Sequence, residues 1–289
     1  MKIGFAGLGV MGAPMARHLV QAGHEVAGFN RSPDKARAWA AATGGRFAAT
    51  VTEAADGTEL LILCVGNDDD VRQVVSEALP HLAAGTVIVD HTTTSARIAR
   101  EMAEAAVGQG CAFIDAPVSG GQAGAENGQL SVMAGGDPDA LARVEPVLMS
   151  YSKAVKHMGP SGSGQLTKMV NQIAIAGVVQ GLAEAVHFAE VAGLDAEAAY
   201  DAISKGAAQS WQMDNRWKTM AEGRFDFGFA VDWMRKDLGL VLDEARANGA
   251  HLSLTALVDQ FYSEVQSMGG SRWDTSSLAA RLQARNPQR

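Results

Sequence analysis

The chain has 289 residues, of which 47% are hydrophobic and 19% charged, and its formal net charge is −8 at neutral pH. This composition is typical of a globular protein with a sizeable core, and the length fits one large domain or two ordinary ones. The acidic balance, without any cluster of lysines and arginines interleaved with aromatic residues, argues against nucleic acids and anionic membranes as partners.

The two cysteines, Cys64 and Cys111, each lie in an apolar run that predicts a buried strand. They are therefore interpreted as inert core thiols rather than as a disulfide or a catalytic pair. The first predicted strand begins at Lys2, with no signal peptide ahead of it. Reduced thiols and the missing signal together lead us to expect a cytoplasmic protein.

From the N-terminus, short apolar runs alternate with helical patterns. Strands are predicted at residues 2–6, 24–29, 60–65, 86–90 and 111–115, with two late strands at 130–134 and 154–157. Helices are predicted between them at 13–22, 34–43, 69–79 and 95–108. This rhythm indicates βαβ units, and the nearly continuous apolar strands indicate a sheet covered on both faces. The sequence therefore predicts an α/β fold with an N-terminal Rossmann-type doubly wound sheet.

The pattern changes at the stretch GPSGSG, residues 159–164, after which no strand is predicted. Helical patterns cover 165–192, 195–205, 211–222, 231–247, 255–267 and 276–284, and only 285–289 is expected to fray. We therefore place a Rossmann domain at 1–162 and an all-helical C-terminal domain at 163–289, joined by one long interdomain helix.

The long helix predicted at 165–192 is apolar around much of its circumference. Polar side chains such as Gln180, Glu184 and Glu190 interrupt it, which favours a buried helix over a membrane span. Its apolar surface is more than one small domain readily covers, so we expect a homodimer or homotetramer.

Three glycines follow the first strand in the spacing G-x-G-x-x-G. The run reads Gly7-Leu8-Gly9-Val10-Met11-Gly12. In this pattern the first glycine permits a tight turn, the second lets the backbone approach a pyrophosphate, and the third lets helix and strand pack closely. The following helix offers N–H groups and a positive dipole end to the phosphates. Since a strand precedes the run and a helix follows it, we predict dinucleotide binding rather than a merely structural turn.

The residues after the second strand, Asn30, Arg31 and Ser32, bear on which dinucleotide binds. An acidic residue there would accept a hydrogen bond from the ribose 2′-OH of NAD, whereas an arginine pairs with the 2′-phosphate of NADP. No carboxylate stands at the strand tip, and Arg31 and Ser32 can hold a phosphate. The pattern favours NADP(H). In the alternative, Arg31 is solvated, Asp34 serves the ribose and the cofactor is NAD(H).

Two later segments carry groups suited to a small carboxylate substrate. Ser119, Gly120 and Gly121 follow a predicted strand at the edge where open α/β sheets bind ligands, although an ordinary turn has the same composition. Lys168 lies among apolar neighbours near the start of the long helix, and Asn171 shares its face. Desolvation can tune such a lysine for acid or base chemistry, but most lysines are merely solvated, so position alone leaves its role open.

Taken together, these motifs resemble the β-hydroxyacid dehydrogenase family. The matching segments are 7–16, 115–121, 162–164 followed by Lys168 and Asn171, and 236–238. They span essentially the whole chain in the family's order. Members include 3-hydroxyisobutyrate dehydrogenase, tartronate semialdehyde reductase and the glyoxylate/succinic semialdehyde reductases. The resemblance implies an NAD(P)-dependent 3-hydroxyacid dehydrogenase or semialdehyde reductase.

The resemblance also implies roles for individual residues. Lys168 matches the catalytic lysine, a general acid/base, and Asn171, with Gln172 after it, matches a substrate-orienting amide. Residues 119–121 match the loop that binds the substrate carboxylate. Four further positions match cofactor contacts, namely Val65 and Gly66 along the dinucleotide, Thr93 beside the nicotinamide, and Lys236 reaching from the helical domain.

Three departures leave the exact semialdehyde open: Gln172 replaces a common asparagine, the loop after Val65 lacks a proline, and 209–213 differs. No metal site is predicted, because the seven histidines are scattered. Three alternatives remain. A decarboxylating phosphosugar dehydrogenase would be longer and carry basic residues for a substrate phosphate. An imine reductase usually replaces the lysine found at Lys168, and a non-catalytic NADP-binding sensor or scaffold loses it.

Overall fold

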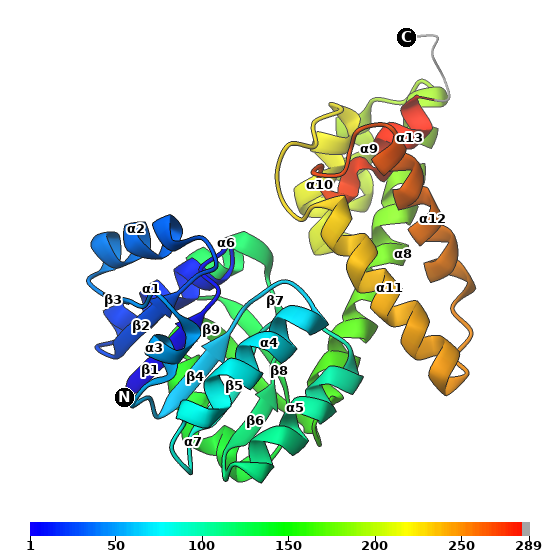
Figure 1. The fold of residues 1–289 in the computed structure, drawn as a ribbon. Coiled ribbons are helices and arrows are strands. Elements are labelled where there is room, and N and C mark those ends of the chain that lie inside the picture. The colour runs from blue at the N-terminus through cyan, green and yellow to red at the C-terminus, as the bar shows by residue number, and fades with distance from the viewer. Residues whose placement is uncertain (285–289) are drawn as a thin grey trace. The chain divides into compact units, whose positions relative to one another are not determined.

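The computed structural model describes residues 1–284 and divides into two compact units, Met1–Lys168 and the part from Met169 onward (Figure 1). Each unit has its own hydrophobic core. One helix, α8 (Ser163–Val191), carries the chain from the first unit into the second, and the predicted domain boundary falls at its start. The stretch 285–289, expected to fray, lies outside the described residues.

The first unit is built on a nine-stranded sheet in the order β3-β2-β1-β4-β5-β6-β8-β7, with β9 paired to β8. The strands are β1 (Lys2–Ala6), β2 (Glu25–Phe29), β3 (Arg46–Phe47), β4 (Leu60–Leu63), β5 (Val87–Asp90), β6 (Ala112–Asp115), β7 (Val118–Ser119), β8 (Leu130–Gly135) and β9 (Ser152–Gly159). Strands β1 to β6 pair in parallel, whereas β8 is antiparallel to β6 and β7. The order 3-2-1-4-5-6 is that of the doubly wound dinucleotide-binding fold, and it reverses direction between β1 and β4.

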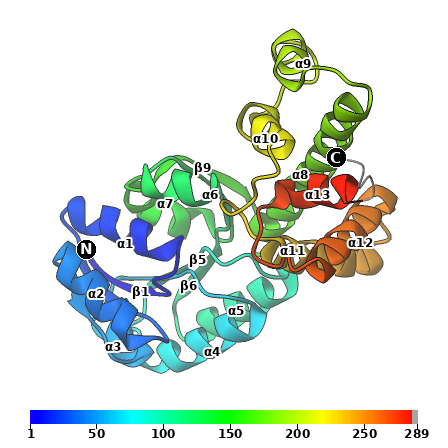
Figure 2. The ribbon, with the colours of Figure 1, turned by 90° about the horizontal axis from the view of Figure 1, so that it is seen from above.

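Helices cover both faces of this sheet. They are α1 (Gly12–Gln21), α2 (Pro33–Thr43), α3 (Val51–Ala55), α4 (Asp68–Ala78), α5 (Ala96–Gly108), α6 (Gly121–Glu126) and α7 (Pro138–Leu148), with a 3₁₀ turn at Leu79–His81. One core lies under α1, α2 and α7 and the other under α3, α4 and α5. Figure 2 shows α1 and α7 on one side of the strands and α4 and α5 on the other.

Strand β4 shows why its sequence is apolar without a break. Leu60 and Ile62 point into the core beneath α1, while Leu61 and Leu63 point into the core beneath α4. Successive strand residues face opposite sides of the sheet, so a strand covered on both sides needs an apolar residue at every position. The predicted α/β fold with a Rossmann-type sheet is confirmed.

The second unit is helical. After α8 come α9 (Ala196–Ile203), α10 (Trp211–Ala221), α11 (Val231–Asn248), α12 (Ser253–Ser267), a 3₁₀ turn (Thr275–Ser277) and α13 (Leu278–Gln283). Their core packs residues such as Val186, Trp217, Leu238 and Tyr262. Within 169–284 the only extended pairing is an isolated bridge between Ala230 and Asp274, which agrees with the prediction of an all-helical second half.

Several local predictions were wrong or incomplete. Neither cysteine lies inside a strand: β4 ends at Leu63, although the Cys64 N–H still donates to Ala6 O, and the Cys111 N–H donates to Ala106 O at the end of α5. The short elements β3, α3, β7 and α6 were not predicted, because two to six residues show too little periodicity. Helix α7 was missed because Pro146, inside it, normally ends a helix.

By length and composition, α8 could also cross a membrane, with a mean hydropathy of 1.3 over its most apolar window. Of that window 44% is buried inside the protein, and the core helix of a soluble protein meets the same criterion. Buried α8 residues such as Ala183 and Val186 belong to the second core. The described chain therefore accounts for much of this apolarity by packing.

Candidate functional site

The glycine-rich loop between β1 and α1 has the geometry of a dinucleotide cradle. Gly7 has φ +102°, and a Cβ there would lie 2.1 Å from the carbonyl oxygen of Cys64. A Cβ on Gly12 would lie 1.9 Å from Gly7 O, so this glycine lets α1 approach the sheet. A Cβ on Gly9 would meet nothing within 4 Å. Gly7 and Gly12 are therefore required by the fold, whereas Gly9 leaves open space for a ligand.

The start of α1 is suited to an anion. The side chain of Met11, at the N-cap position, makes no capping hydrogen bond, and the first turn holds no acidic residue. Val10 is exposed, whereas Leu8 is buried in the core and its N–H donates to Asn30 Oδ1 at 3.0 Å. The residues present therefore fit a pyrophosphate at the end of this helix dipole.

The tip of β2 lies beside this loop. Asn30 holds it together, because its amide also donates to Ser32 O at 3.2 Å. The side chain of Arg31 is 90% exposed, and its Nη1 lies 3.3 Å from Asp70 Oδ1. Ser32 is exposed and precedes α2 without a side-chain cap bond. Asn30 is thus a structural bridge, and Arg31 is the cation available at the strand tip.

The loop after β4 and the loop after β5 are tied to each other. The N–H of Val65 donates to Thr92 Oγ1 at 3.0 Å, and the N–H of Gly66 donates to Asp70 Oδ2 at 3.1 Å. The residues on either side of Thr93 are both hydrogen-bonded to Gln165 on α8. The Gln165 amide accepts from Thr94 N at 3.0 Å and donates to Thr92 O at 2.7 Å. A fully buried glutamine therefore fixes the backbone around the predicted nicotinamide-side threonine.

Asp115, the last residue of β6, fastens the start of α8. Its Oδ1 accepts from Gly162 N at 2.7 Å and its Oδ2 accepts from Gln165 N at 2.9 Å. Burial raises the pKa of Asp115 to about 6, against the lowering effect of these backbone donors. Gly164 explains the glycine-rich stretch here, since a Cβ would lie 2.4 Å from Asp115 O.

Lys168 lies on the next turns of α8, and the carbonyl of Val118 holds its side chain. The buried Nζ donates to Val118 O at 3.0 Å, one residue before Ser119. Ser119 is half-buried in β7, and Gly120 and Gly121 follow with φ +131° and +62°. The first unit therefore brings the predicted catalytic ammonium next to the predicted carboxylate loop. The spacing of the two motifs along the chain does not indicate this proximity.

The second unit holds the other three predicted site residues in one chain of contacts. Asn171 Nδ2 donates to Gln172 Oε1 at 2.8 Å, and Gln172 Nε2 donates to Asp237 Oδ2 at 2.7 Å. The other oxygen of Asp237 lies 3.4 Å from Lys236 Nζ. Gln172 and Asp237 are both buried, and each end of the Gln172 amide is engaged by a neighbouring side chain.

Comparison with known proteins agrees with this geometry. Two family models match: the NAD binding domain of 6-phosphogluconate dehydrogenase over residues 2–159, and the NAD-binding domain of NADP-dependent 3-hydroxyisobutyrate dehydrogenase over residues 162–282. An uncharacterized oxidoreductase of Shewanella frigidimarina is 61% identical over 285 residues, which cover 98% of each chain. The chain belongs to the β-hydroxyacid dehydrogenase family. It is therefore an NAD(P)-binding oxidoreductase of this family.

Two further relatives show the extent of the family likeness. The Arabidopsis thaliana protein named "Probable 3-hydroxyisobutyrate dehydrogenase-like 1, mitochondrial" is 40% identical over 289 residues, or 99% of this chain and 86% of that one. The structure of Mycobacterium tuberculosis 3-hydroxyisobutyrate dehydrogenase with L-serine is 34% identical, with a TM-score of 0.89 over 97% of this chain and 98% of that one.

More distant structures mark the limits of the comparison. Psf3, solved in complex with NADP+ and 2-OPP, is 25% identical with a TM-score of 0.86, over 97% of this chain and 99% of that one. The imine reductase of Pseudomonas sp. is 22% identical with a TM-score of 0.59, over 97% of this chain and 98% of that one. At that identity the imine reductase shares the fold alone with this β-hydroxyacid dehydrogenase family member.

Four residues that contribute to the site were not singled out from the sequence: Asp70, Asp115, Gln165 and Asp237. Each is a polar residue that acts on a neighbour far along the chain, and no local spacing indicates such a pairing. A signal existed for Asp115, since a carboxylate at the end of an apolar strand is placed to cap a nearby helix. In this family member the site thus depends on a layer of buried polar side chains behind the predicted residues.

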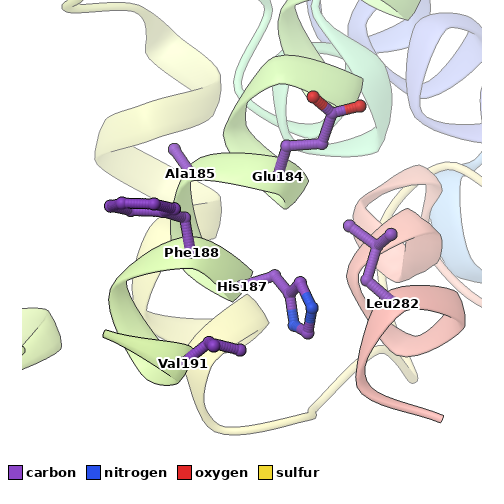
Figure 3. A pocket seen from close by; sticks show the side chains of 6 residues that line it. All are labelled: Glu184, Ala185, His187, Phe188, Val191 and Leu282. Carbon is purple, nitrogen blue, oxygen red and sulfur yellow. The ribbon is translucent and has the colours of Figure 1, made fainter. Parts of the chain in front are cut away.

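The last turns of α8, away from Lys168, line a pocket of about 490 Å³. Its residues are Glu184, Ala185, His187, Phe188, Val191 and Leu282. Figure 3 shows the imidazole of His187 turned toward Leu282 while the ring of Phe188 lies on the other side of the helix. Phe188 and Val191 are exposed. The expected homo-oligomer stays a prediction.

Proposed function

We propose that the protein reversibly transfers a hydride between NAD(P)(H) and a short 3-hydroxy acid or its semialdehyde. The observation that carries this proposal is the hydrogen bond between Lys168 Nζ and Val118 O, which holds an ammonium group beside the Ser119–Gly121 loop. Bound NAD(P)H supplies the hydride from C4 of its nicotinamide ring. The chain itself supplies the proton, the orientation of the substrate and the cradle for the phosphates.

Lys168 is proposed to act as the general acid and base. In the reducing direction, negative charge grows on the aldehyde oxygen, and the ammonium stabilises that charge and delivers a proton. In the oxidising direction the lysine must first be neutral, and it then removes the hydroxyl proton. Proton transfer of this kind typically contributes about 10²–10⁴ in rate.

The carboxylate of the substrate is proposed to bind at Ser119, Gly120 and Gly121. The positive φ values turn the backbone sharply here, and both glycines are exposed, so their N–H groups and the serine hydroxyl can donate to an anion. Capture of the carboxylate fixes which carbon lies nearest to Lys168.

The proposed cofactor is NADP(H). Arg31 is the cation at the tip of β2, and no acidic residue precedes it there. The family model for residues 162–282 is named for an NADP-dependent enzyme, and Psf3 was solved with NADP+. Asp34, in the first turn of α2, is the residue that would serve NAD(H) instead.

Initial rates with NADPH and NADH test the proposal, using methylmalonate, tartronate and succinate semialdehydes and glyoxylate as substrates. Wild type is compared with Lys168→Ala and with Lys153→Ala, which removes an exposed lysine from β9 of the same unit. We expect Lys168→Ala to lose about a hundredfold or more in kcat, with dinucleotide affinity unchanged, and Lys153→Ala to match wild type. Fluorescence titration of NADPH measures the affinity.

Two outcomes would overturn the proposal. Full activity in Lys168→Ala would remove the lysine from the chemistry. A wild type that binds NADPH but reduces none of the four aldehydes would favour an imine substrate or a non-catalytic NADP-binding sensor. The imine reductase alternative has only a fold-level likeness in its support.

A further inference from the structure

Asp70 contacts both the loop after β2 and the loop after β4. It occupies the first turn of α4, where its N–H donates to the N-cap residue Asn67 at 2.9 Å. One carboxylate oxygen accepts from Gly66 N at 3.1 Å, and the other lies 3.3 Å from Arg31 Nη1. The side chain of Asp70 is 25% exposed, against 90% for Arg31. The carboxylate is therefore also held by the backbone N–H of Gly66, whereas the guanidinium is almost fully exposed to solvent.

The position of this ion pair matters because Arg31 is the cation that would meet a 2′-phosphate at the tip of β2. A guanidinium that pairs with Asp70 must give up or share that contact to pair with a phosphate. A phosphate beside Arg31 also comes close to the negative charge of Asp70, since the two side chains touch. A ribose 2′-OH, being neutral, meets neither obstacle.

We propose that Asp70 is a specificity-determining residue, which lowers the preference of the protein for NADPH over NADH by competing for Arg31. The inference rests on the proposed function in that it needs a nicotinamide dinucleotide in the first unit, but it concerns only binding. Asp70 is proposed to act through Arg31 and not on a reacting atom.

A simpler interpretation gives Asp70 a purely local role, as a helix-start residue with an exposed ion pair. Such pairs contribute little to stability, and the bond to Gly66 N would persist with any residue that keeps an oxygen at this position. Asparagine keeps that oxygen and removes the charge. The two interpretations therefore differ in what Asp70→Asn does to the choice of dinucleotide.

The test measures dissociation constants by titration calorimetry for NADPH, NADH, 2′-AMP and 5′-AMP. The last two differ only in where the phosphate is attached to the ribose, so they isolate the effect of the 2′-phosphate. The proteins are wild type, Asp70→Asn, Arg31→Ala and the double variant. The matched control is Asp69→Asn, which removes the same charge one residue away, from a side chain that pairs with Arg72 instead. No turnover is required.

We expect Asp70→Asn to tighten NADPH and 2′-AMP by up to about fivefold, the ceiling that an exposed ion pair sets, with NADH and 5′-AMP unchanged. In the Arg31→Ala background only the repulsion between Asp70 and the phosphate is left, and the same substitution is expected to change the NADPH constant less than about twofold. Asp69→Asn should match wild type.

Three results would overturn the inference: an unchanged ratio of NADPH to NADH affinity in Asp70→Asn, an equal gain in Asp69→Asn, or the full gain in the Arg31→Ala background. If neither dinucleotide binds to wild type, the proposed function fails instead, and the two failures are distinguishable because the first requires measurable binding. Circular dichroism of each variant confirms that the fold is kept.

Discussion

At the scale of single residues, the amide of Gln172 shows how a buried side chain can orient a half-buried one, Asn171. Replacing Gln172 with leucine removes both its bond to Asn171 and its bond to Asp237. The buried carboxylate of Asp237 then has one donor fewer. We expect the KM for the carboxylate substrate to rise about tenfold, the worth of one hydrogen bond, while kcat changes little. Steady-state kinetics with the best aldehyde of the panel measures both.

A double-mutant cycle separates orientation from direct contact. If Gln172 acts only through Asn171, then Gln172→Leu adds almost nothing to KM in an Asn171→Ala background. Additive effects of the two substitutions would mean that Gln172 contacts the substrate itself. Urea unfolding of each variant separately measures how much the free energy of unfolding falls when the buried carboxylate of Asp237 loses a donor.

At the scale of elements, the start of α8 depends on Asp115. Truncating a capping carboxylate costs about 0.5–2 kcal/mol of unfolding free energy, and we expect this loss for Asp115→Ala. The same loss is expected for Asp137→Ala, because Asp137 caps α7 by accepting from Ala140 N at 2.8 Å. Only the first variant should also lower kcat, by about tenfold, since α8 and not α7 carries Lys168.

Thermal unfolding and initial rates on the two cap variants check this prediction. Equal kcat values in Asp115→Ala and Asp137→Ala would show that Lys168 keeps its place without the cap. A rate loss in both would mean that any loss of stability in the first unit lowers activity. The comparison is informative because both substitutions remove a carboxylate that accepts from N–H groups at a helix start in the same unit, one from the end of β6 and one from the N-cap of α7.

The elements also show what a sequence can predict and where it stops. The run Leu60–Leu63 and the glycines around Gly9 carry their information locally, in apolarity and spacing, so the sheet and the cradle were predictable. The contacts of Asp115 with Gly162 and of Gln165 with Thr92 join residues far apart in the chain. No periodicity records such pairings. The candidate residues of the site could therefore be named from the sequence, whereas those that hold them in place could not.

At the scale of the whole molecule, a buried histidine links stability to pH. The Nδ1 of His91 donates to Ala116 O at 2.6 Å, so its Nε2 accepts from the hydroxyl of Tyr151 at 2.7 Å. Burial lowers the pKa of His91 to about 4, although the bond to Ala116 opposes the shift. The contribution of this histidine is therefore complete above pH 6.5 and is lost as the pH falls toward 4, because only the unfolded chain takes up the proton.

Asp115 titrates in the same range with the opposite sign, since its raised pKa makes the folded state gain stability as the pH falls from 6. The variant His91→Gln isolates the histidine, because Asp115 is common to both proteins. We expect the stability difference between wild type and His91→Gln to shrink by about 3 kcal/mol between pH 6.5 and 4. Urea unfolding at several pH values measures it, and a constant difference would contradict the prediction.

The way α8 is fastened bears on how members of this family diverge. The bonds described for Asp115, Gln165 and Lys168 lie within the first unit, while the amide chain from Asn171 to Asp237 lies within the second. Substitutions at residues of the second unit are therefore expected to alter this amide chain while leaving in place the bonds that hold Lys168.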